Sequence, residues 1–153
     1  MVRFLDLDDS EAARRLAAIG TEIVPTTDEG AEHVVVARVL PIGERGVRVE
    51  VDIEPPDDPF AGMGAWHRNA QTEAHTVRSG SGVVEFWTPD GAVSARLEAG
   101  DVMVVRGGEH RYRPLTAQRW AIRHSGPADT ELETTDTGRP SDAWPVDGPT
   151  AVG

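Results

Sequence analysis

Apolar and polar residues alternate in several stretches of the chain with the two-residue period of a β-strand that buries one face. The clearest case is residues 47–53, VRVEVDI, where the apolar side chains fall on one face and the charged side chains on the other. Residues 33–40 are rich in β-branched valine and are followed by Pro41. Both segments are predicted to be strands, and the proline-rich residues 54–60 are predicted to be a loop.

Short apolar segments separated by glycine and proline turns continue through the second half of the chain. Residues 83–87, 92–97, 102–105 and 119–123 are each predicted to be strands. The sequence PDG at residues 89–91 predicts a tight hairpin, because proline presets φ and Asp-Gly tolerates the positive φ of such turns. Many short strands at intervals of roughly eight to twelve residues predict an all-β fold, either a barrel or a double-sheet jelly roll.

The two ends of the chain depart from this strand pattern. Residues 10–19 are predicted to form a short helix, with Ser10 as its N-cap and Gly20 as the glycine that ends it. Residues 127–153 contain four prolines and many Asp, Glu and Thr residues. We expect this acidic tail to be flexible, or to dock through Trp144.

Length and composition narrow the function. A chain of 153 residues predicts one domain, residues 1–126, with its barrel at about residues 33–124. The net charge of −11 argues against nucleic acid and anionic membranes as partners, so we expect a small-molecule substrate. The absence of cysteine excludes thiolate chemistry, and the absence of lysine excludes Schiff-base chemistry on lysine. With no signal-like or membrane-spanning apolar run, a cytoplasmic location is expected.

Three of the five histidines fall close to a glutamate in a pattern that predicts a metal site. Residues two apart on a strand share a face, so His67 aligns with Asn69, and Glu73 aligns with His75. If these strands are adjacent and face the barrel interior, His67 and Glu73 converge, and His110 reaches the same place. Two imidazoles and one carboxylate on one side of a metal are the ligands of non-haem Fe(II) oxygenases. The same set would also hold Zn, Ni, Co or Mn.

The spacing of these residues resembles that of the cupin superfamily. Its first motif is G-x5-H-x-H-x3-4-E-x6-G and its second is G-x5-P-x-G-x2-H-x3-N. His67, Glu73 and Gly80 match the first motif with its spacing, and Gly100 and His110 match the second. The resemblance covers residues from about 33 to 124 and implies a small jelly-roll barrel with a metal ion inside.

The chain also departs from the cupin pattern. Asn69 occupies the place of the second histidine, which leaves His67, Glu73 and His110 as a three-ligand set. That set is similar to the ligand pattern of 3-hydroxyanthranilate dioxygenase. Acireductone dioxygenase fits less well, because its pattern has a histidine where this chain has Asn69. The second motif lacks its proline and has one residue fewer before His110.

We expect from these residues and from the resemblance a metal-dependent enzyme, with an Fe(II) dioxygenase acting on a small polar organic molecule as the leading hypothesis. The alternatives are a non-redox cyclase, isomerase or lyase that uses Zn or Ni, and a non-catalytic cupin that binds a ligand. We expect His75 to carry a proton or to be an extra ligand, and Asn69 to contact the substrate. Because cupins commonly pair through strands or swapped termini, a homodimer is expected. Four further residues around His110 are candidates for contacts to substrate: Arg106, Arg111, Tyr112 and Arg113.

Overall fold

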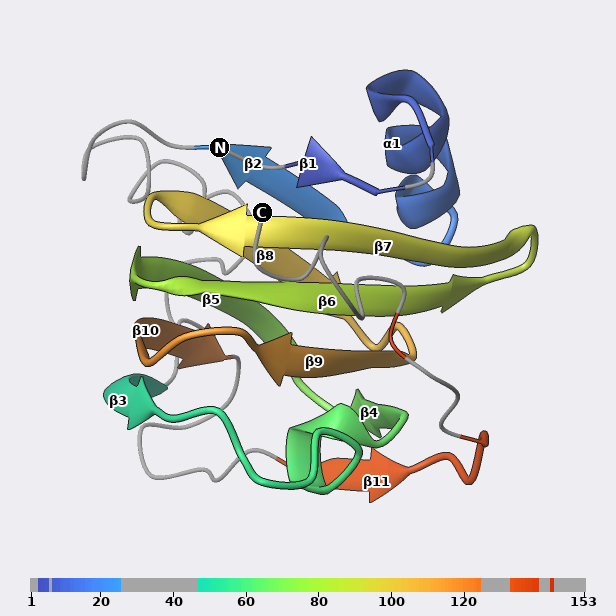
Figure 1. The fold of residues 1–153 in the computed structure, drawn as a ribbon. Coiled ribbons are helices and arrows are strands. Elements are labelled where there is room, and N and C mark those ends of the chain that lie inside the picture. Colours follow the sequence, from blue (N-terminus) through green and yellow to red (C-terminus); the bar gives the residue numbers. More distant parts are fainter. Residues whose placement is uncertain (1–2, 6, 26–46, 125–132, 141–143, 145–153) are drawn as a thin grey trace.

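Two antiparallel β-sheets face each other and enclose a common interior (Figure 1). The computed structural model describes residues 3–5, 7–25, 47–124, 133–140 and 144. Within them, the strands are β1 (Arg3–Phe4), β2 (Glu22–Pro25), β3 (Val47–Ile53), β4 (His67–Asn69), β5 (Thr72–Ser79), β6 (Ser81–Thr88), β7 (Gly91–Glu98), β8 (Asp101–Arg106), β9 (His110–Pro114), β10 (Gln118–His124) and β11 (Thr134–Asp136). The first sheet has the order β1-β7-β6-β9-β4-β11 and the second the order β2-β8-β5-β10-β3. This arrangement confirms the predicted all-β jelly roll.

The predicted strands of the second half fall inside β6, β7, β8 and β10, and the strand predicted at residues 47–53 is β3. The PDG turn joins β6 to β7, and Gly91 in it has a φ of 113°, a value that side chains rarely allow. The strand predicted at residues 33–40 lies outside the described residues. Every segment predicted to be a strand, where the structure describes it, is therefore a strand.

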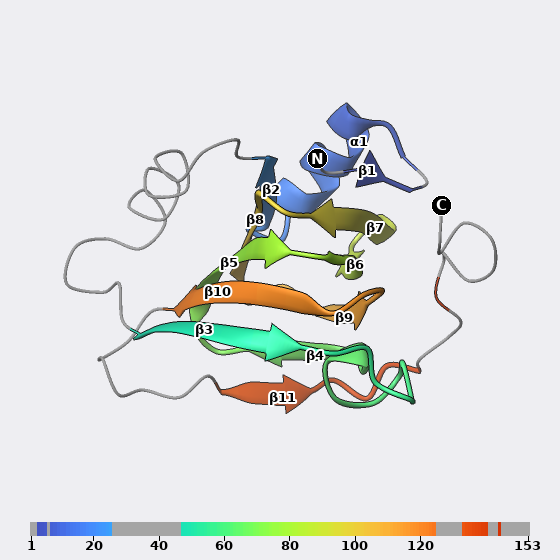
Figure 2. The ribbon, with the colours of Figure 1, turned by 60° about the vertical axis from the view of Figure 1, so that its left-hand side comes forward.

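One short α-helix, α1 (Asp9–Ala17), packs against β2, β6 and β7 (Figure 2). Its N-cap is Asp8 and not Ser10 as predicted, because the Asp8 carboxylate accepts a hydrogen bond of 2.8 Å from the Glu11 amide. Gly20 follows the helix with a φ of 70°, as expected for the residue that ends it. No helix in the described ranges is long and apolar enough to cross a lipid bilayer.

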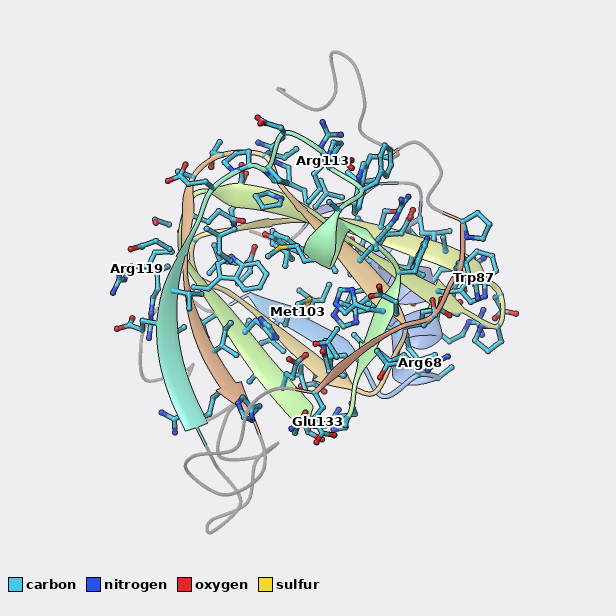
Figure 3. The ribbon with its side chains drawn as sticks, turned by 90° about the horizontal axis from the view of Figure 1, so that it is seen from below. Arg68, Trp87, Met103, Arg113, Arg119 and Glu133 are labelled. Carbon is cyan, nitrogen blue, oxygen red and sulfur yellow. The ribbon has the colours of Figure 1, made fainter. Side chains whose placement is uncertain are left out.

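The hydrophobic core lies between the two sheets. Val84, Phe86 and Leu97 from the first sheet pack with Val105 from the second, and each is almost fully buried. Burying side chains of this size stabilises the fold by roughly 1.5–3 kcal/mol each. Met103, which belongs to this core, lies near the middle of the barrel when the molecule is seen from below (Figure 3).

Part of the segment expected to be a flexible tail is packed onto the barrel. Strand β11 pairs with β4, with Thr134 opposite Asn69. The indole of Trp144 is buried and donates a hydrogen bond of 3.2 Å to the carbonyl of Pro59. Of the two alternatives expected for this tail, docking through Trp144 is the one that the described residues show. The pattern missed β11 because the strand is short, polar and exposed on every residue.

Candidate metal centre

A cavity of about 300 Å³ lies inside the barrel, at the end viewed in Figure 3. The polar part of its lining comes from β4, β5, β9 and β11, and the apolar part comes mainly from β3, β8 and β10. The lining residues are Val51, Ile53, Gly62, Met63, His67, Asn69, Glu73, His75, Met103, His110, Tyr112, Trp120, Ile122 and Thr134. His67, Glu73 and His110 therefore line one cavity.

Two buried histidines lie side by side on neighbouring strands of the first sheet. His67 on β4 pairs in register with His110 on β9, and the centroids of their rings are 4.4 Å apart. In each residue Nδ1 donates to a backbone carbonyl two residues earlier, to Ala65 at 2.7 Å and to Gly108 at 2.9 Å. A carbonyl oxygen only accepts hydrogen bonds, so the proton must sit on Nδ1. With its proton on Nδ1, each ring has Nε2 as the nitrogen that could bind a metal.

The environment of His110 keeps its ring neutral. Burial, reinforced by the neighbouring His67, lowers the pKa of His110 to about 4. Metal ions bind the neutral imidazole, and protons compete with them for the same nitrogen. At neutral pH, His110 is therefore in the form that can act as a ligand.

Glu73 on β5 is fully buried and presents one carboxylate oxygen without a partner. Its Oε2 accepts a hydrogen bond of 2.8 Å from the Asn69 amide and lies 3.3 Å from Nε2 of His75. Its Oε1 has no hydrogen-bond partner. Burial alone would raise the pKa of this carboxyl, but His75, His110 and the Asn69 amide together hold it below its usual value. Glu73 is therefore a buried carboxylate with an open position.

His75 shares the inward face of β5 with Glu73. Its ring is buried and meets the ring of Trp120 edge-on, with 5.0 Å between the centroids. Neither ring nitrogen makes a hydrogen bond within the described residues. Buried polar atoms almost always have partners in native structures, so such atoms in a cavity mark a place where a ligand can bind.

The donor types of these residues suit a divalent metal, but in this structure the donor atoms do not surround one point. Imidazole and carboxylate donors suit Fe, Zn, Ni, Co and Mn. As the side chains stand, no group of three or more His, Asp or Glu residues in the described ranges is arranged to hold an ion. The donors form two pairs around the cavity, His67 with His110 and Glu73 with His75. Holding one ion requires side-chain rotation that brings the two pairs together.

Asn69 and Tyr112 line the cavity, but their polar groups are engaged with the protein. The Asn69 amide donates to Glu73, and its oxygen accepts a hydrogen bond of 2.7 Å from the hydroxyl of Thr134. The Tyr112 hydroxyl donates to Gln118 at 2.8 Å. Both residues can contact a substrate through their surfaces, while their hydrogen-bonding groups serve the protein.

The predicted arginine contacts to substrate are not found in the cavity. Arg106 follows the buried core residue Val105 on β8, so strand alternation turns it outward, where its guanidinium donates to the carbonyl of Gly20 at 2.9 Å. Arg111 follows His110 in the same way and pairs with Glu85 on the opposite face of the first sheet. Arg113 does not line the cavity either. The assignment of Arg106 to substrate binding is therefore corrected.

From the sequence, Trp120, Ile122 and Thr134 were not identified as cavity residues. Trp120 and Ile122 lie two apart on β10, so the alternation of this predicted strand could have identified them. Thr134 carried no such signal, because β11 was not recognisable as a strand. The wall of the cavity was partly predictable, and the contribution of the C-terminal strand was not.

Comparison with known proteins finds similarity in structure alone. No family model and no curated protein matches the sequence. Among solved structures, an acireductone dioxygenase from Bacillus anthracis with a cadmium ion in its active centre aligns with a TM-score of 0.56 and 16% identity, over 81% of this chain and 91% of its own. An oxalate decarboxylase from Lactobacillus farciminis in a formate complex aligns with a TM-score of 0.48 and 16% identity, over 76% of this chain and 30% of its own. Identities this low show the fold and not the reaction. The similarity to the acireductone dioxygenase, together with the two antiparallel sheets, shows that the chain has a cupin fold.

Proposed function

We propose that this protein is a metal-dependent cupin enzyme, an Fe(II) dioxygenase in which His67, Glu73 and His110 hold one divalent metal ion. The observation that carries the proposal is one cavity lined by two buried imidazoles, whose Nδ1 atoms donate to backbone carbonyls, and by a buried carboxylate with a free oxygen. When bound, the ion would polarise substrate oxygens and, if it is iron, would let electrons pass between substrate and O₂. The dioxygenase among the structural neighbours supports this class by analogy of fold.

The protein's own residues would bind and shield the substrate. At about 300 Å³ the cavity is at the small end of ligand pockets, and Tyr112, Trp120 and Met103 give it apolar walls that exclude water. No arginine from the described ranges lines it. We therefore infer that the substrate is a small molecule with two adjacent polar donor atoms and little charge beyond them, such as an enediol or an aminophenol-type ring. The metal site would supply the counter-charge to those donors.

Oxygen consumption tests this proposal. The full chain is stripped of metal, loaded without oxygen with either Fe(II) or Zn(II), and mixed with catechol or ortho-aminophenol as probes. We expect oxygen uptake and ring-opened product only in the Fe(II) form, and neither in Glu73→Ala. A matched control is His124→Gln, since His124 is buried on β10 but does not line the cavity.

The two alternatives give different results in the same experiment. A non-redox cyclase, isomerase or lyase would convert a probe in the Zn(II) or Ni(II) form without oxygen uptake. A non-catalytic cupin would bind the probes in every metal form and convert none of them. Either result would overturn the dioxygenase proposal. The expected homodimer stays a prediction, which light scattering on the purified chain would test.

A further inference from the structure

We propose that His75 is a fourth metal ligand in this site, and that Asn69 is instead a positioning residue for Glu73. The inference rests on the proposed metal site and goes beyond its three ligands. In the cupin pattern, the place of Asn69 belongs to a histidine on the same strand as His67. The structure assigns that lost imidazole to the next strand, β5, two residues beyond Glu73.

Both polar groups of the Asn69 side chain are engaged with the protein. Its amide nitrogen donates to Glu73 Oε2 at 2.8 Å, and a carboxylate can only accept, so the orientation of the amide is fixed. Its oxygen then faces the hydroxyl of Thr134, which donates to it at 2.7 Å. Both ends of this buried side chain are therefore engaged, and its oxygen is held toward Thr134, whereas the nitrogens of His75 have no hydrogen-bond partner.

His75 has the opposite character. Both of its ring nitrogens are buried and have no hydrogen-bond partner among the described residues, although the ring lines the cavity. His67 and His110 each have Nδ1 satisfied by a backbone carbonyl, so His75 is the histidine of the cavity with both nitrogens open. A free imidazole nitrogen beside a carboxylate is a common ligand arrangement for first-row metals.

The position of His75 on its strand allows it to share an ion with Glu73. Residues two apart on a strand project from the same face, and here Nε2 of His75 lies 3.3 Å from Oε2 of Glu73 without hydrogen-bond geometry. The two side chains already approach a common point. The edge-on contact with Trp120 holds the ring on the cavity side of the sheet.

The same observations argue against the proton-carrying role first expected for His75. A proton carrier needs a hydrogen-bonded route that takes the proton away after it is picked up. Nδ1 of His75 has no partner in the described ranges, and Nε2 meets only Oε2 of Glu73, at 3.3 Å and without hydrogen-bond geometry, in a buried setting. A ligand role needs only the free nitrogen that the structure shows.

Asn69 also links the C-terminal strand β11 to the site through hydrogen bonds. The hydrogen bonds run from Thr134 on β11 to Asn69 on β4 and on to Glu73 on β5. These two hydrogen bonds position Oε2 of Glu73 and leave Oε1 without a partner. Groups that orient a ligand in this way typically change metal affinity by about 10–100-fold when they are removed.

Titration of the metal-free full chain with Co(II) separates these roles, because the visible absorption of Co(II) reports its ligands. We expect His75→Ala and His75→Gln to weaken Co(II) binding by at least about 100-fold and to change the spectrum, since even outer partners cost about 10–100-fold. Added imidazole should restore the spectrum of His75→Ala, which a folding defect would not allow. The readout does not depend on turnover.

The positioning role predicts a different pattern. Asn69→Ala and Thr134→Val should weaken Co(II) binding by about 10-fold while the spectrum keeps its wild-type shape. Thr134→Ser should restore the affinity, because it keeps the hydroxyl. Thr135→Val is the matched control, since Thr135 lies on the same strand and pairs with Arg68 away from the cavity. We expect it to bind Co(II) as the wild type does.

The outcomes distinguish this inference from the proposed function. If the wild type binds Co(II), His67→Ala loses it, and His75→Ala keeps the wild-type affinity and spectrum, then the fourth-ligand inference is wrong and the three-ligand site stands. A change in the Co(II) absorption spectrum of Asn69→Ala would likewise contradict the proposal that His75, and not Asn69, is a ligand. If the wild type itself takes up no Co(II), the metal site fails, and the inference fails with it.

Discussion

His110 and Arg111 are neighbours on β9 and both are buried, yet they belong to two clusters with opposite properties. His110 points into the barrel and joins His67, Glu73 and His75, which we term the inner cluster. Arg111 points to the other face of the first sheet and joins Glu85, Trp66 and Trp144, which we term the outer cluster. The alternation of a single strand thus separates a candidate site from a structural contact.

The outer cluster is satisfied. Arg111 donates to Oε1 of Glu85 from Nε at 3.0 Å and from Nη2 at 2.8 Å. Its guanidinium also lies over the rings of Trp66 and Trp144, at 5.0 and 4.0 Å from their centroids. The second oxygen of Glu85 accepts a hydrogen bond from Ser94 at 2.8 Å. These charges stabilise one another, and neither Glu85 nor Arg111 presents an unpartnered polar atom to the cavity of about 380 Å³ that both residues line.

The inner cluster is unsatisfied at three buried atoms, Oε1 of Glu73 and both ring nitrogens of His75. Burial without partners costs about 1–3 kcal/mol for each polar group. A protein keeps such a cost where a ligand offsets it. The comparison teaches that buried charge alone does not identify a site, whereas buried charge with open donors does.

The largest effect on stability should come from breaking the outer cluster. In Arg111→Met, Glu85 keeps its place in the fold but loses its counter-charge. Removing one member of a buried ion pair costs about 3–5 kcal/mol. We expect a loss of that size in the free energy of unfolding by denaturant, with unchanged Co(II) affinity of the folded protein.

The double variant Arg111→Met/Glu85→Leu supplies the control. Because it removes both charges, it should recover much of the stability that the single variant loses. If Arg111→Met left stability unchanged but abolished metal binding, the division into a structural and a functional cluster would be wrong.

A smaller effect is expected from pH on the metal-free inner cluster. The pKa of His110 is about 4 in the folded chain against an ordinary value of 6.5, so the unfolded chain binds more protons between these values. Stability therefore rises with pH through this window and is lost as the pH falls from 6.5 to 4, by up to about 3 kcal/mol. Denaturant unfolding in the presence of a chelator would measure it.

His110→Gln is the matched variant for this slope. It keeps a polar side chain in place but has no group that titrates in this range. The difference in stability between wild type and variant should grow as the pH is raised from 4 to 6.5 and stay constant above it. The lowered pKa of Glu73 contributes only at lower pH, since its stabilisation is lost as the pH falls below its usual value of 4.5. A pH-independent difference would contradict the buried, neutral state of His110.

The smallest effect should come from the contact that fastens the C-terminal segment. Arg139 donates two hydrogen bonds to Glu109, at 2.9 and 3.0 Å, and stacks over Trp87. Glu109 keeps a third partner in Thr137, so Arg139→Ala should cost only about 1–2 kcal/mol of unfolding free energy. The exposed pair of Arg119 with Asp52 is the control, and Arg119→Ala should cost less than about 1 kcal/mol. Equal losses of unfolding free energy in Arg139→Ala and Arg119→Ala would show that the contact with Glu109 does not stabilise the packing of the C-terminal segment.

The sequence predicted the fold and the inner cluster better than it predicted the surroundings of either. Strict alternation in residues 47–53 predicted a strand and the PDG sequence predicted a tight turn, and the structure confirms both. The spacing from His67 to Glu73 brought these side chains to one cavity. Both signals are local, since they depend on residues close together in the chain.

What the sequence did not reveal depends on contacts between distant segments. Arg106 was assigned to substrate binding because it is near His110 in the chain, but the alternation of β8 turns it outward. Thr134 reaches the site only because a polar strand pairs with β4, and nothing in its composition shows this. The partners of Asn69 and Arg111 are likewise set by the packing of the sheets and not by any motif.

The most direct test of the central claim is the metal content of the full chain, purified without added metal or chelator and measured by elemental analysis. Wild type is compared with His67→Ala and Glu73→Ala, and folding of each is checked by circular dichroism. The account predicts about one equivalent of a first-row metal per chain in the wild type and none in either folded variant. A wild-type chain that holds no metal and takes up neither Fe(II), Ni(II) nor Zn(II) would contradict it.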